Sequence, residues 1–209
     1  MNEFQKSYYH KRGQVLVKNL QKRHFDAYYC DCAAEALEKA LELIPEGASV
    51  GWGGAMSAQQ IGLIDAVKTP KYRAIDRMTA PDRDQAMREC LLADVFLCGA
   101  NALSMDGEMV SIDGNGNRVA AIVYGPKSVI VIAGMNKVVD TLEDAITRAR
   151  TVAAPINQQR FMLPNPCTET GTCADCLTPT CICNQILITR HCRPAGRIKF
   201  ILVGEDIGM

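Results

Sequence analysis

The chain has no excess charge of either sign and no long apolar run. Its 23 Lys and Arg residues balance 23 Asp and Glu residues, so the formal net charge at pH 7 is zero. Without a net positive charge the chain has no overall attraction for nucleic acid, and we expect no nucleic-acid partner. The longest apolar run, 128–134, has the length of a strand and is too short for a membrane span. Charge and hydropathy therefore argue against a nucleic-acid-binding protein and against a membrane protein.

Aromatic residues make up only 6% of the chain, and no linker rich in Ser, Gly or Pro and no internal repeat divides it. These features are typical of an ordinary α/β enzyme scaffold. The charged stretch 1–26 lacks the apolar core of a signal peptide, so we expect a cytoplasmic protein. With 209 residues the chain can bury one sizeable core, and we predict a single domain over residues 1–209.

Cysteine, in contrast, is abundant near the C-terminus. Five of the ten cysteines lie between Cys167 and Cys183, and Cys192 follows, which defines a cysteine-rich segment at 166–192. Thiolates at such short separations, interleaved with glycine and proline, can converge on one soft metal ion or an iron–sulfur cluster. In a cytoplasmic chain we take metal binding as the first interpretation. Reduced thiols without a function, and disulfides or a redox switch, remain as alternatives.

Short runs rich in β-branched residues alternate with segments of helical period. Strands are predicted at 48–52, 94–99, 128–134, 185–191 and 197–206, and helices at 34–44, 57–67, 81–91 and 141–153. Continuous apolar strands that alternate with helices indicate a parallel sheet buried on both faces. We therefore predict an α/β fold with a mainly parallel sheet and helices on both faces, plus a small C-terminal cysteine-rich metal-binding insertion.

Two helix starts carry capping patterns. Ser57 precedes Gln60 by three residues, and Thr141 precedes Asp144 by three. A hydroxyl followed three residues later by a carboxylate or amide side chain is the pattern of a capping box. We expect both hydroxyls to cap helices.

A glycine-rich loop follows the first of these predicted strands. In parallel sheets ligands bind at the carboxyl ends of strands, and glycines let backbone N–H groups approach an anion. The candidate ligand-binding residues of this loop are Gly51, Gly53, Gly54 and Ser57. The loop is not a dinucleotide fingerprint, because Met56 stands where the last glycine belongs. A tight turn that needs glycine for backbone reasons is the competing explanation.

A second group of polar residues, 98–118, follows the predicted strand 94–99. The candidate catalytic residues are Asp106, Asp113 and Asn101, and Asn117 and Arg118 are candidates for ligand binding. A hairpin closed by Asp-Gly turns would explain about half of these residues without any chemistry.

Three further polar residues lie outside these loops, near the C-terminus. Glu205 and Asp206 follow the last predicted strand, and His191 precedes Cys192. Exposed side chains at such positions more often serve as solvated surface than as acid–base groups. We expect all three to lie on the surface.

Three long blocks resemble a known family. They are SVGWGGAMSAQQIGL, DVFLCGANALSMDGEMVSIDGNGNRVAAIVYGPKSVIVIAGMNKVV, and a tail that runs from VAAPINQQRF through PCTETGTCADC to GRIKFILVGEDIG. In this order they resemble the LUD (lactate-utilisation) domain family over residues 5–209. The resemblance implies a fold similar to the sugar-phosphate isomerase and coenzyme A transferase superfamily. It also implies an association with the oxidation of L-lactate to pyruvate in an iron–sulfur-containing complex.

The resemblance further implies which cysteines bind metal. Four fall on positions that recur in short members of the family, namely Cys167, Cys173, Cys176 and Cys183. Cys181 does not fall on a recurring position but could substitute for one of the four ligands. Cys192 is a more distant candidate ligand. Four thiolates suit tetrahedral zinc, but iron–sulfur clusters tolerate the irregular spacing seen here and match a redox role. An iron–sulfur cluster is therefore the preferred cofactor, with zinc as the alternative.

Three hypotheses for function follow. The chain is a component of lactate oxidation, possessing a cluster and a pocket for lactate, pyruvate or a partner's cofactor. Alternatively it is an isomerase-like or transferase-like enzyme for a phosphosugar-like anion, with Asp106 or Asp113 as the base and a structural zinc knuckle. The third hypothesis is a non-catalytic subunit whose zinc knuckle binds a partner. We expect a small anionic ligand and either a protein partner or a second copy of the chain.

Overall fold

The centre of the protein is a six-stranded sheet in which every neighbouring pair is parallel. The computed structural model describes residues 1–209. The strands lie in the order β1 (Asp26–Cys30), β10 (Ile198–Val203), β7 (Ser128–Gly134), β4 (Val95–Gly99), β2 (Ser49–Trp52) and β3 (Arg73–Ile75). The predicted parallel sheet is confirmed.

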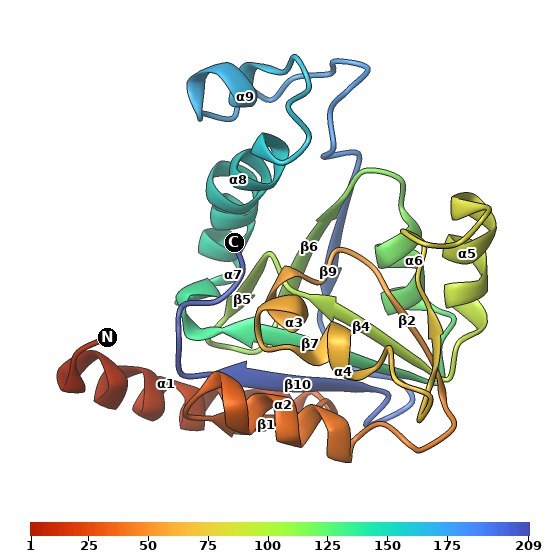
Figure 1. Cartoon of the computed structure of the whole chain (residues 1–209). Coiled ribbons are helices and arrows are strands. Elements are labelled where there is room, and N and C mark those ends of the chain that lie inside the picture. The colour runs from red at the N-terminus through yellow and green to blue at the C-terminus, as the bar shows by residue number, and fades with distance from the viewer.

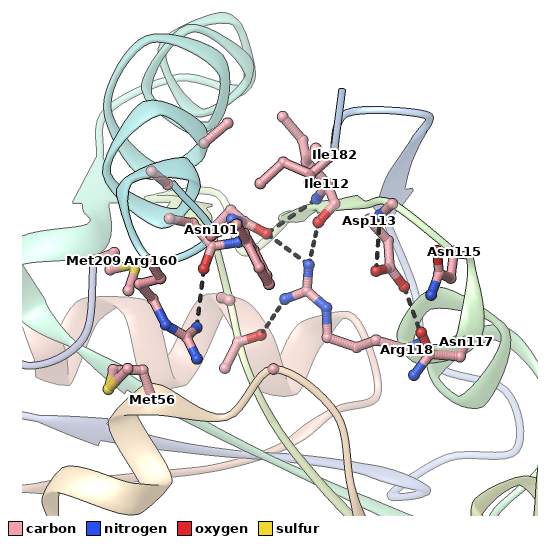
Figure 2. Close-up of a pocket in the computed structure, with 18 of the residues that line it drawn as sticks. Met56, Asn101, Ile112, Asp113, Asn115, Asn117, Arg118, Arg160, Ile182 and Met209 are labelled. Atoms are coloured by element: carbon pink, nitrogen blue, oxygen red, sulfur yellow. Dashed lines mark hydrogen bonds between the residues drawn. The ribbon is translucent and has the colours of Figure 1, made fainter. Parts of the chain in front are cut away.

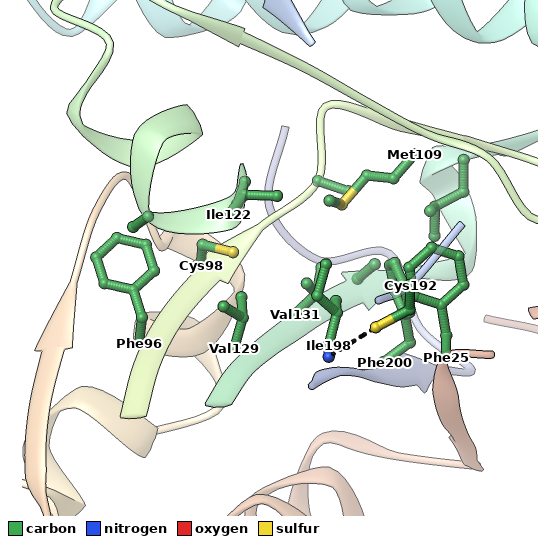
Figure 3. Packing of buried hydrophobic residues seen from close by; sticks show 14 of the residues in the cluster. Phe25, Phe96, Cys98, Met109, Ile122, Val129, Val131, Cys192, Ile198 and Phe200 are labelled. Carbon is green, nitrogen blue, oxygen red and sulfur yellow. Dashed lines mark hydrogen bonds between the residues drawn. The ribbon is translucent and has the colours of Figure 1, made fainter. Parts of the chain in front are cut away.

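Helices cover both faces of this sheet, as predicted (Figure 1). One face packs against α1 (Glu3–Lys22), α5 (Arg83–Glu89), the short turn η1 (Cys90–Leu92) and α6 (Asn117–Val123). The other packs against α2 (Ala33–Glu42), α3 (Met56–Gln60) and α4 (Leu63–Ala66). Successive side chains of β4 alternate between the two cores, since Phe96 belongs to the first and Leu97 to the second. Figure 3 shows the first core around Phe96 and Phe200.

A second sheet of four strands packs beside the first. Its order is β8 (Val138–Val139), β5 (Ala102–Ser104), β6 (Met109–Asp113) and β9 (Gln185–Thr189). β5 and β6 form an antiparallel hairpin whose turn contains Gly107 at φ +93°, a conformation that favours glycine. The predicted strand at 185–191 lies here as β9, antiparallel to β6, and is not part of the parallel sheet. Its outer side chains, Ile186 and Ile188, are exposed, so burial does not force it into the core.

The remaining elements connect the two sheets. A short turn, η2 (Met135–Lys137), follows β7, and α7 (Leu142–Arg148) continues through a π-helical turn, η3 (Ala149–Ala153), into α8 (Ala154–Gln159). A one-turn helix, α9 (Pro166–Thr170), opens the cysteine-rich segment, and Figure 1 shows this helix beyond the end of α8, away from the parallel sheet. None of the helices combines the length and the apolarity needed to cross a membrane.

The two predicted capping boxes differ in outcome. Thr141 caps α7 as predicted, with its hydroxyl accepting from the Asp144 backbone N–H and the Asp144 carboxylate accepting from the Thr141 backbone N–H. The prediction for Ser57 is wrong, because α3 begins at Met56 after an N-cap of Ala55 and has no side-chain cap. The Ser57 hydroxyl instead meets a residue 80 positions away, Lys137, which local sequence does not reveal.

The first helix and strand, which hydrophobic periodicity did not single out, pack closely against each other. Gly13 is buried on α1, and a β-carbon placed there would lie 2.1 Å from Cδ2 of Tyr29 on β1. Glycine at this position therefore allows the helix to approach the ring.

We expect Gly13→Ala to destabilise the protein by about 1–3 kcal/mol, because the new methyl group would overlap the Tyr29 ring. Alanine in an unobstructed helix would have the opposite effect, since its helix propensity exceeds that of glycine by about 1 kcal/mol. Gln14→Ala, on the exposed face of the same helix, is the matched control and should change stability little. The measurement is chemical denaturation, and a Gly13→Ala protein more stable than wild type would contradict the prediction.

Candidate functional site

A cavity of about 490 Å³ lies at the carboxyl ends of the central parallel strands (Figure 2). We call it the strand-end pocket. Gly54 comes from the loop after β2, Asn101 from the loop after β4, and Lys137 from the turn after β7. Residues of β6, α6, η3 and α8 complete the wall. The pocket is therefore where α/β sheets bind ligands, and its volume is within the usual range for small-molecule sites.

Positive charge dominates the lining of the strand-end pocket. Five cationic side chains contribute, namely Arg77, Arg83, Arg118, Lys137 and Arg160, against one acidic side chain, that of Asp113, and the last residue, Met209, also lines the pocket. Asp113 accepts hydrogen bonds from the backbone N–H groups of Gly114 at 3.0 Å, Arg118 at 2.8 Å and Val119 at 3.1 Å. Oδ2 thus anchors the start of α6, and Oδ1 accepts from Gly114 in the turn that precedes the helix. This placement argues against the predicted role of Asp113 as a base and leaves the cations without a compensating side chain.

Arg118 organises the floor of the pocket. Its buried guanidinium donates to the Gly99 carbonyl at 3.1 Å, to Asn101 Oδ1 at 2.9 Å and to the Ile112 carbonyl. The backbone N–H of Ile112 also donates to Asn101 Oδ1, at 3.0 Å. These bonds join the end of β4 to β6, and so connect the two sheets. The predicted site residues Asn101 and Arg118 are therefore brought together.

Some of the other predicted site residues line the pocket, and the rest lie outside it. Gly54, Ser57 and Asn117 line the pocket with Asn101, Asp113 and Arg118. Gly53 lies behind Arg118, and a β-carbon there would be 3.1 Å from the arginine side chain. Gly51 lies inside β2, against Cys90.

Asp106 occupies the β5–β6 turn, where its backbone carbonyl accepts from Arg23 Nε at 2.6 Å. It is not part of the pocket lining, so the structure separates it from the other candidate residues. Asp206 accepts a hydrogen bond from Tyr9 at 2.7 Å, and neither it nor Glu205 lines the pocket.

Sequence reasoning missed four of the five cations. Lys137 follows the predicted strand 128–134 by three residues and could have been found by inspecting that strand end. Arg77, Arg83 and Arg160 come from segments that carry no motif, and only the fold brings them to the pocket.

Lys137 is buried, with 3% of its surface exposed, although it lines the pocket. Its amine donates to Ser57 Oγ at 2.9 Å and to the Ala100 carbonyl at 3.2 Å, and no carboxylate pairs with it. Burial, and then the charges of Arg148 and Arg118, lower the pKa of Lys137 to about 7. The amine can therefore gain or lose a proton near neutral pH.

A second cavity, of about 220 Å³, is lined by all five clustered cysteines, Cys167, Cys173, Cys176, Cys181 and Cys183. We call it the cysteine cavity. Ala154 and Ile182 line both cavities, so the two adjoin. The structure thus gathers in space the thiols that cluster in sequence, and it places them beside the strand-end pocket.

The donor chemistry of the cysteine cavity suits zinc or an iron–sulfur cluster, since both bind thiolates. No three of these side chains, however, are arranged as a group that could hold a metal ion, so the predicted metal-binding insertion is not confirmed. Burial, and then the neighbouring Cys181, raise the pKa of Cys183 to about 12, whereas hydrogen bonds from Thr178 lower the pKa of Cys176. Metal binding would have to deprotonate Cys183.

All ten cysteines are free thiols. Cys192, considered as a reserve ligand, lies in the core of the parallel sheet, where its sulfur accepts from the Ile198 N–H at 3.3 Å (Figure 3). The neighbouring His191 ring lies beside His24, with 4.4 Å between ring centroids. Neither Cys192 nor His191 lines the cysteine cavity.

The fold and the two cavities define an α/β protein with a cationic strand-end pocket and an adjoining cavity lined by cysteines. A family model described as the LUD domain matches residues 13–203, and the chain belongs to this family. The predicted resemblance is thereby confirmed.

A search of solved structures finds a DUF162 family protein from Deinococcus radiodurans, with a TM-score of 0.54 and 12% sequence identity. The match covers 95% of this chain and 97% of that protein, and at this identity it shows a shared fold. Among curated proteins no sequence matches the chain.

The ionisation of Lys137 predicts how stability depends on pH. The unfolded lysine has a pKa of 10.5 and the folded one about 7, so between these values the unfolded chain binds more protons and stability rises with pH. Replacing Lys137 by Met removes this contribution. From pH 7 to pH 10 we expect wild type to gain stability relative to Lys137→Met by on the order of 2–4 kcal/mol.

Denaturation of both proteins at the two pH values provides the measurement. Lys18→Met, which removes an exposed lysine from α1, is the control and should follow the wild-type pH dependence. A difference between wild type and Lys137→Met that stays constant from pH 7 to pH 10 would contradict the lowered pKa.

Proposed function

We propose that the strand-end pocket binds a small anion with a carboxylate or phosphate group, and that in this LUD-family chain the anion is lactate or pyruvate. The family is linked in general to lactate utilisation. The observation that carries the proposal is the ratio of five cationic side chains to one acidic side chain, Asp113, which already accepts hydrogen bonds from the start of α6. Opposite charge from a ligand would balance these cations.

Arg77 is the side chain best placed to bind such an anion. It is partly buried in the pocket lining, and no carboxylate forms an ion pair with it. Burial, and then the charge of Arg83, lower the pKa of Arg77. An anion beside the two guanidiniums would relieve this repulsion and supply an oxygen acceptor to Arg77, which donates to Met87 Sδ at 3.8 Å.

The volume of the strand-end pocket, about 490 Å³, exceeds the needs of a three-carbon acid. Room therefore remains for a larger ligand, such as a phosphosugar-like anion or a partner's cofactor. The isomerase-like alternative loses support on other grounds, because Asp113 is occupied and Asp106 lies elsewhere. Lactate or pyruvate remains the preferred ligand.

We further propose that the cysteine cavity holds an iron–sulfur cluster, with zinc as the alternative, through Cys167, Cys173, Cys176 and Cys183. The clustering of all five thiols around one cavity supports this, and the shared lining residues Ala154 and Ile182 would place a cluster next to the anion. A bound iron–sulfur cluster would supply one-electron transfer. The chain would then be a component of lactate oxidation, and an electron-transfer partner would be needed.

A partner protein is also supported by the surface of this region. Several large apolar side chains are exposed between residues 152 and 188, including Met162, Leu177 and Ile186, and Leu177 is 99% exposed. Exposed apolar groups that gather in one part of a chain are a common feature of protein–protein contact sites. We therefore propose that a partner binds near the cysteine-rich segment.

Replacing Arg77 by Met tests the anion site. We expect the affinity for L-lactate, pyruvate or sulfate to fall by about 10- to 100-fold, because a charge-assisted hydrogen bond contributes about 1.5–3 kcal/mol. Titration calorimetry measures the affinities, and Arg88→Met, an exposed arginine of α5 outside the pocket, is the matched control. If wild-type protein binds none of the three anions, the proposed function is refuted.

Replacing Cys173 and Cys176 together by Ser tests the metal site. Protein purified without oxygen should contain iron, or zinc, in the wild type and lose it in the double variant, while the parallel sheet stays folded. Elemental analysis and the visible spectrum measure this, and dithionite bleaching distinguishes an iron–sulfur cluster from zinc. Cys32→Ser, at the start of α2, is the control and should retain the metal. Full metal content in the double variant would refute the ligand assignment.

A further inference from the structure

The amine of Lys137 is a buried, ionisable group without a counter-ion, at the floor of a pocket rich in positive charge. Its hydrogen-bond partners are Ser57 Oγ and the Ala100 carbonyl, which come from α3 and from the loop after β4. A charged ammonium in such a place is costly, because burial removes water and no carboxylate replaces it. A residue that served only to connect these loops would not need to be a lysine.

The charged groups around the amine also favour its neutral form. Arg148 faces it from α7 and Arg118 from α6, while the Cys98 thiol of β4 is buried and protonated. Neither arginine can lose its proton in a protein, so their charges act on Lys137 at every pH of interest. Burial, repulsion from two permanent cations and the lack of an acidic side chain in an ion pair with it together leave the amine largely uncharged at about pH 8.

The Lys137 amine is covered by backbone except where it faces the strand-end pocket. A β-carbon at Gly208 would lie 2.3 Å from Lys137 Nζ and 2.4 Å from Ser57 Oγ, and one at Gly99 would lie 3.6 Å from Ser57 Oγ. Glycine backbones therefore close over the pair, and the open space that both residues share is the strand-end pocket. Ser57 holds the amine in place and acts as a positioning residue.

An anion that enters the pocket changes this balance. A negative charge within about 4–6 Å of an amine favours the ammonium form, so binding draws a proton from the solvent onto Nζ. An N–H bond forms on Lys137, an O–H bond breaks in the water or buffer acid that supplies the proton, and no electrons move. The resulting ammonium pairs with the anion and can return the proton to an oxygen of the ligand.

We propose that Lys137 is the acid–base residue of the strand-end pocket: its buried amine, held by Ser57 and the Ala100 carbonyl, takes up a proton when a small carboxylate or phosphate anion binds, and exchanges that proton with the bound ligand. This inference rests on the proposed function of the pocket as an anion site. It adds a residue that can give or accept a proton beside the ligand, whereas Asp113 accepts hydrogen bonds from backbone N–H groups and Asp106 does not line the pocket.

Proton uptake on binding tests the proposal. Titration calorimetry at pH 8 in several buffers that differ in protonation enthalpy gives the number of protons taken up for each anion. L-lactate and pyruvate represent carboxylates, and sulfate represents a phosphate group without itself titrating. We expect wild-type protein to take up close to one proton, because the free amine is about nine-tenths deprotonated at one pH unit above its pKa.

Lys137→Arg keeps the positive charge but cannot titrate, so it should bind the anion with proton uptake near zero. Lys137→Met should lose the uptake and weaken binding by about 10-fold. Lys18→Met, on the exposed surface of α1, should match wild type. A lysine with a merely structural role would give no difference in uptake between wild type and Lys137→Arg.

Wild-type protein alone gives a second measurement that does not depend on whether the variants fold. Proton uptake should be small at pH 6, where the amine is already charged, and largest near pH 8. Anion binding without proton uptake at pH 8, or with the same uptake in wild type and Lys137→Arg, would overturn the inference. Absence of binding for all three anions would instead refute the proposed function of the pocket.

Discussion

A single buried guanidinium holds the two sheets together at the place where the pocket forms. Arg118 donates to the carbonyl that ends β4, to the side chain of Asn101, and to the carbonyl of Ile112 on β6. All three acceptors are uncharged oxygens, so the arginine is satisfied in its hydrogen bonds while its charge stays uncompensated. Arg148 acts in the same way on the Asn101 carbonyl, at 2.6 Å. The polar framework of the site is thus built from cations, and its construction leaves positive charge facing the cavity.

That excess of charge is the basis for the proposed anionic ligand, and it also acts on the neighbouring groups. Burial and the charges of Arg148 and Arg118 disfavour the charged form of Lys137. The parallel arrangement explains why the cations and Lys137 lie in one place. The strands β2, β4 and β7 end at the same edge of the sheet, so the loops that follow them start there. The cysteine cavity shares Ala154 and Ile182 with the pocket, which places the soft sulfur donors beside the anion site and supports a combined role.

Much of the framework could be predicted from local patterns. The central strands read as continuous apolar runs because both of their faces are buried, and Thr141 with Asp144 marks a helix start through bonds that span three residues. Strand β9 was predicted as a strand, but its place in the second sheet, antiparallel to β6, depends on contacts with a segment more than 70 residues earlier and could not be read from its composition. Of the site, the glycine-rich loop and the stretch 98–118 were found because they follow strands. Arg77 was missed because the short strand before it, β3, was not predicted, and Arg83 and Arg160 because they lie on or beside helices and follow no strand.

The amino-acid sequence by itself determined the class of fold, the membership of the LUD domain family and the clustering of the five cysteines, since all three depend on residues close together along the chain or on long shared blocks. Only the tertiary structure decided which polar groups share a cavity. It placed Ser57 against Lys137 instead of at a helix cap, used Asp113 to anchor α6, and left Asp106 at a distant turn. The physical reason is that burial, desolvation and the sum of nearby charges arise from contacts between segments far apart in the chain, which no local periodicity encodes.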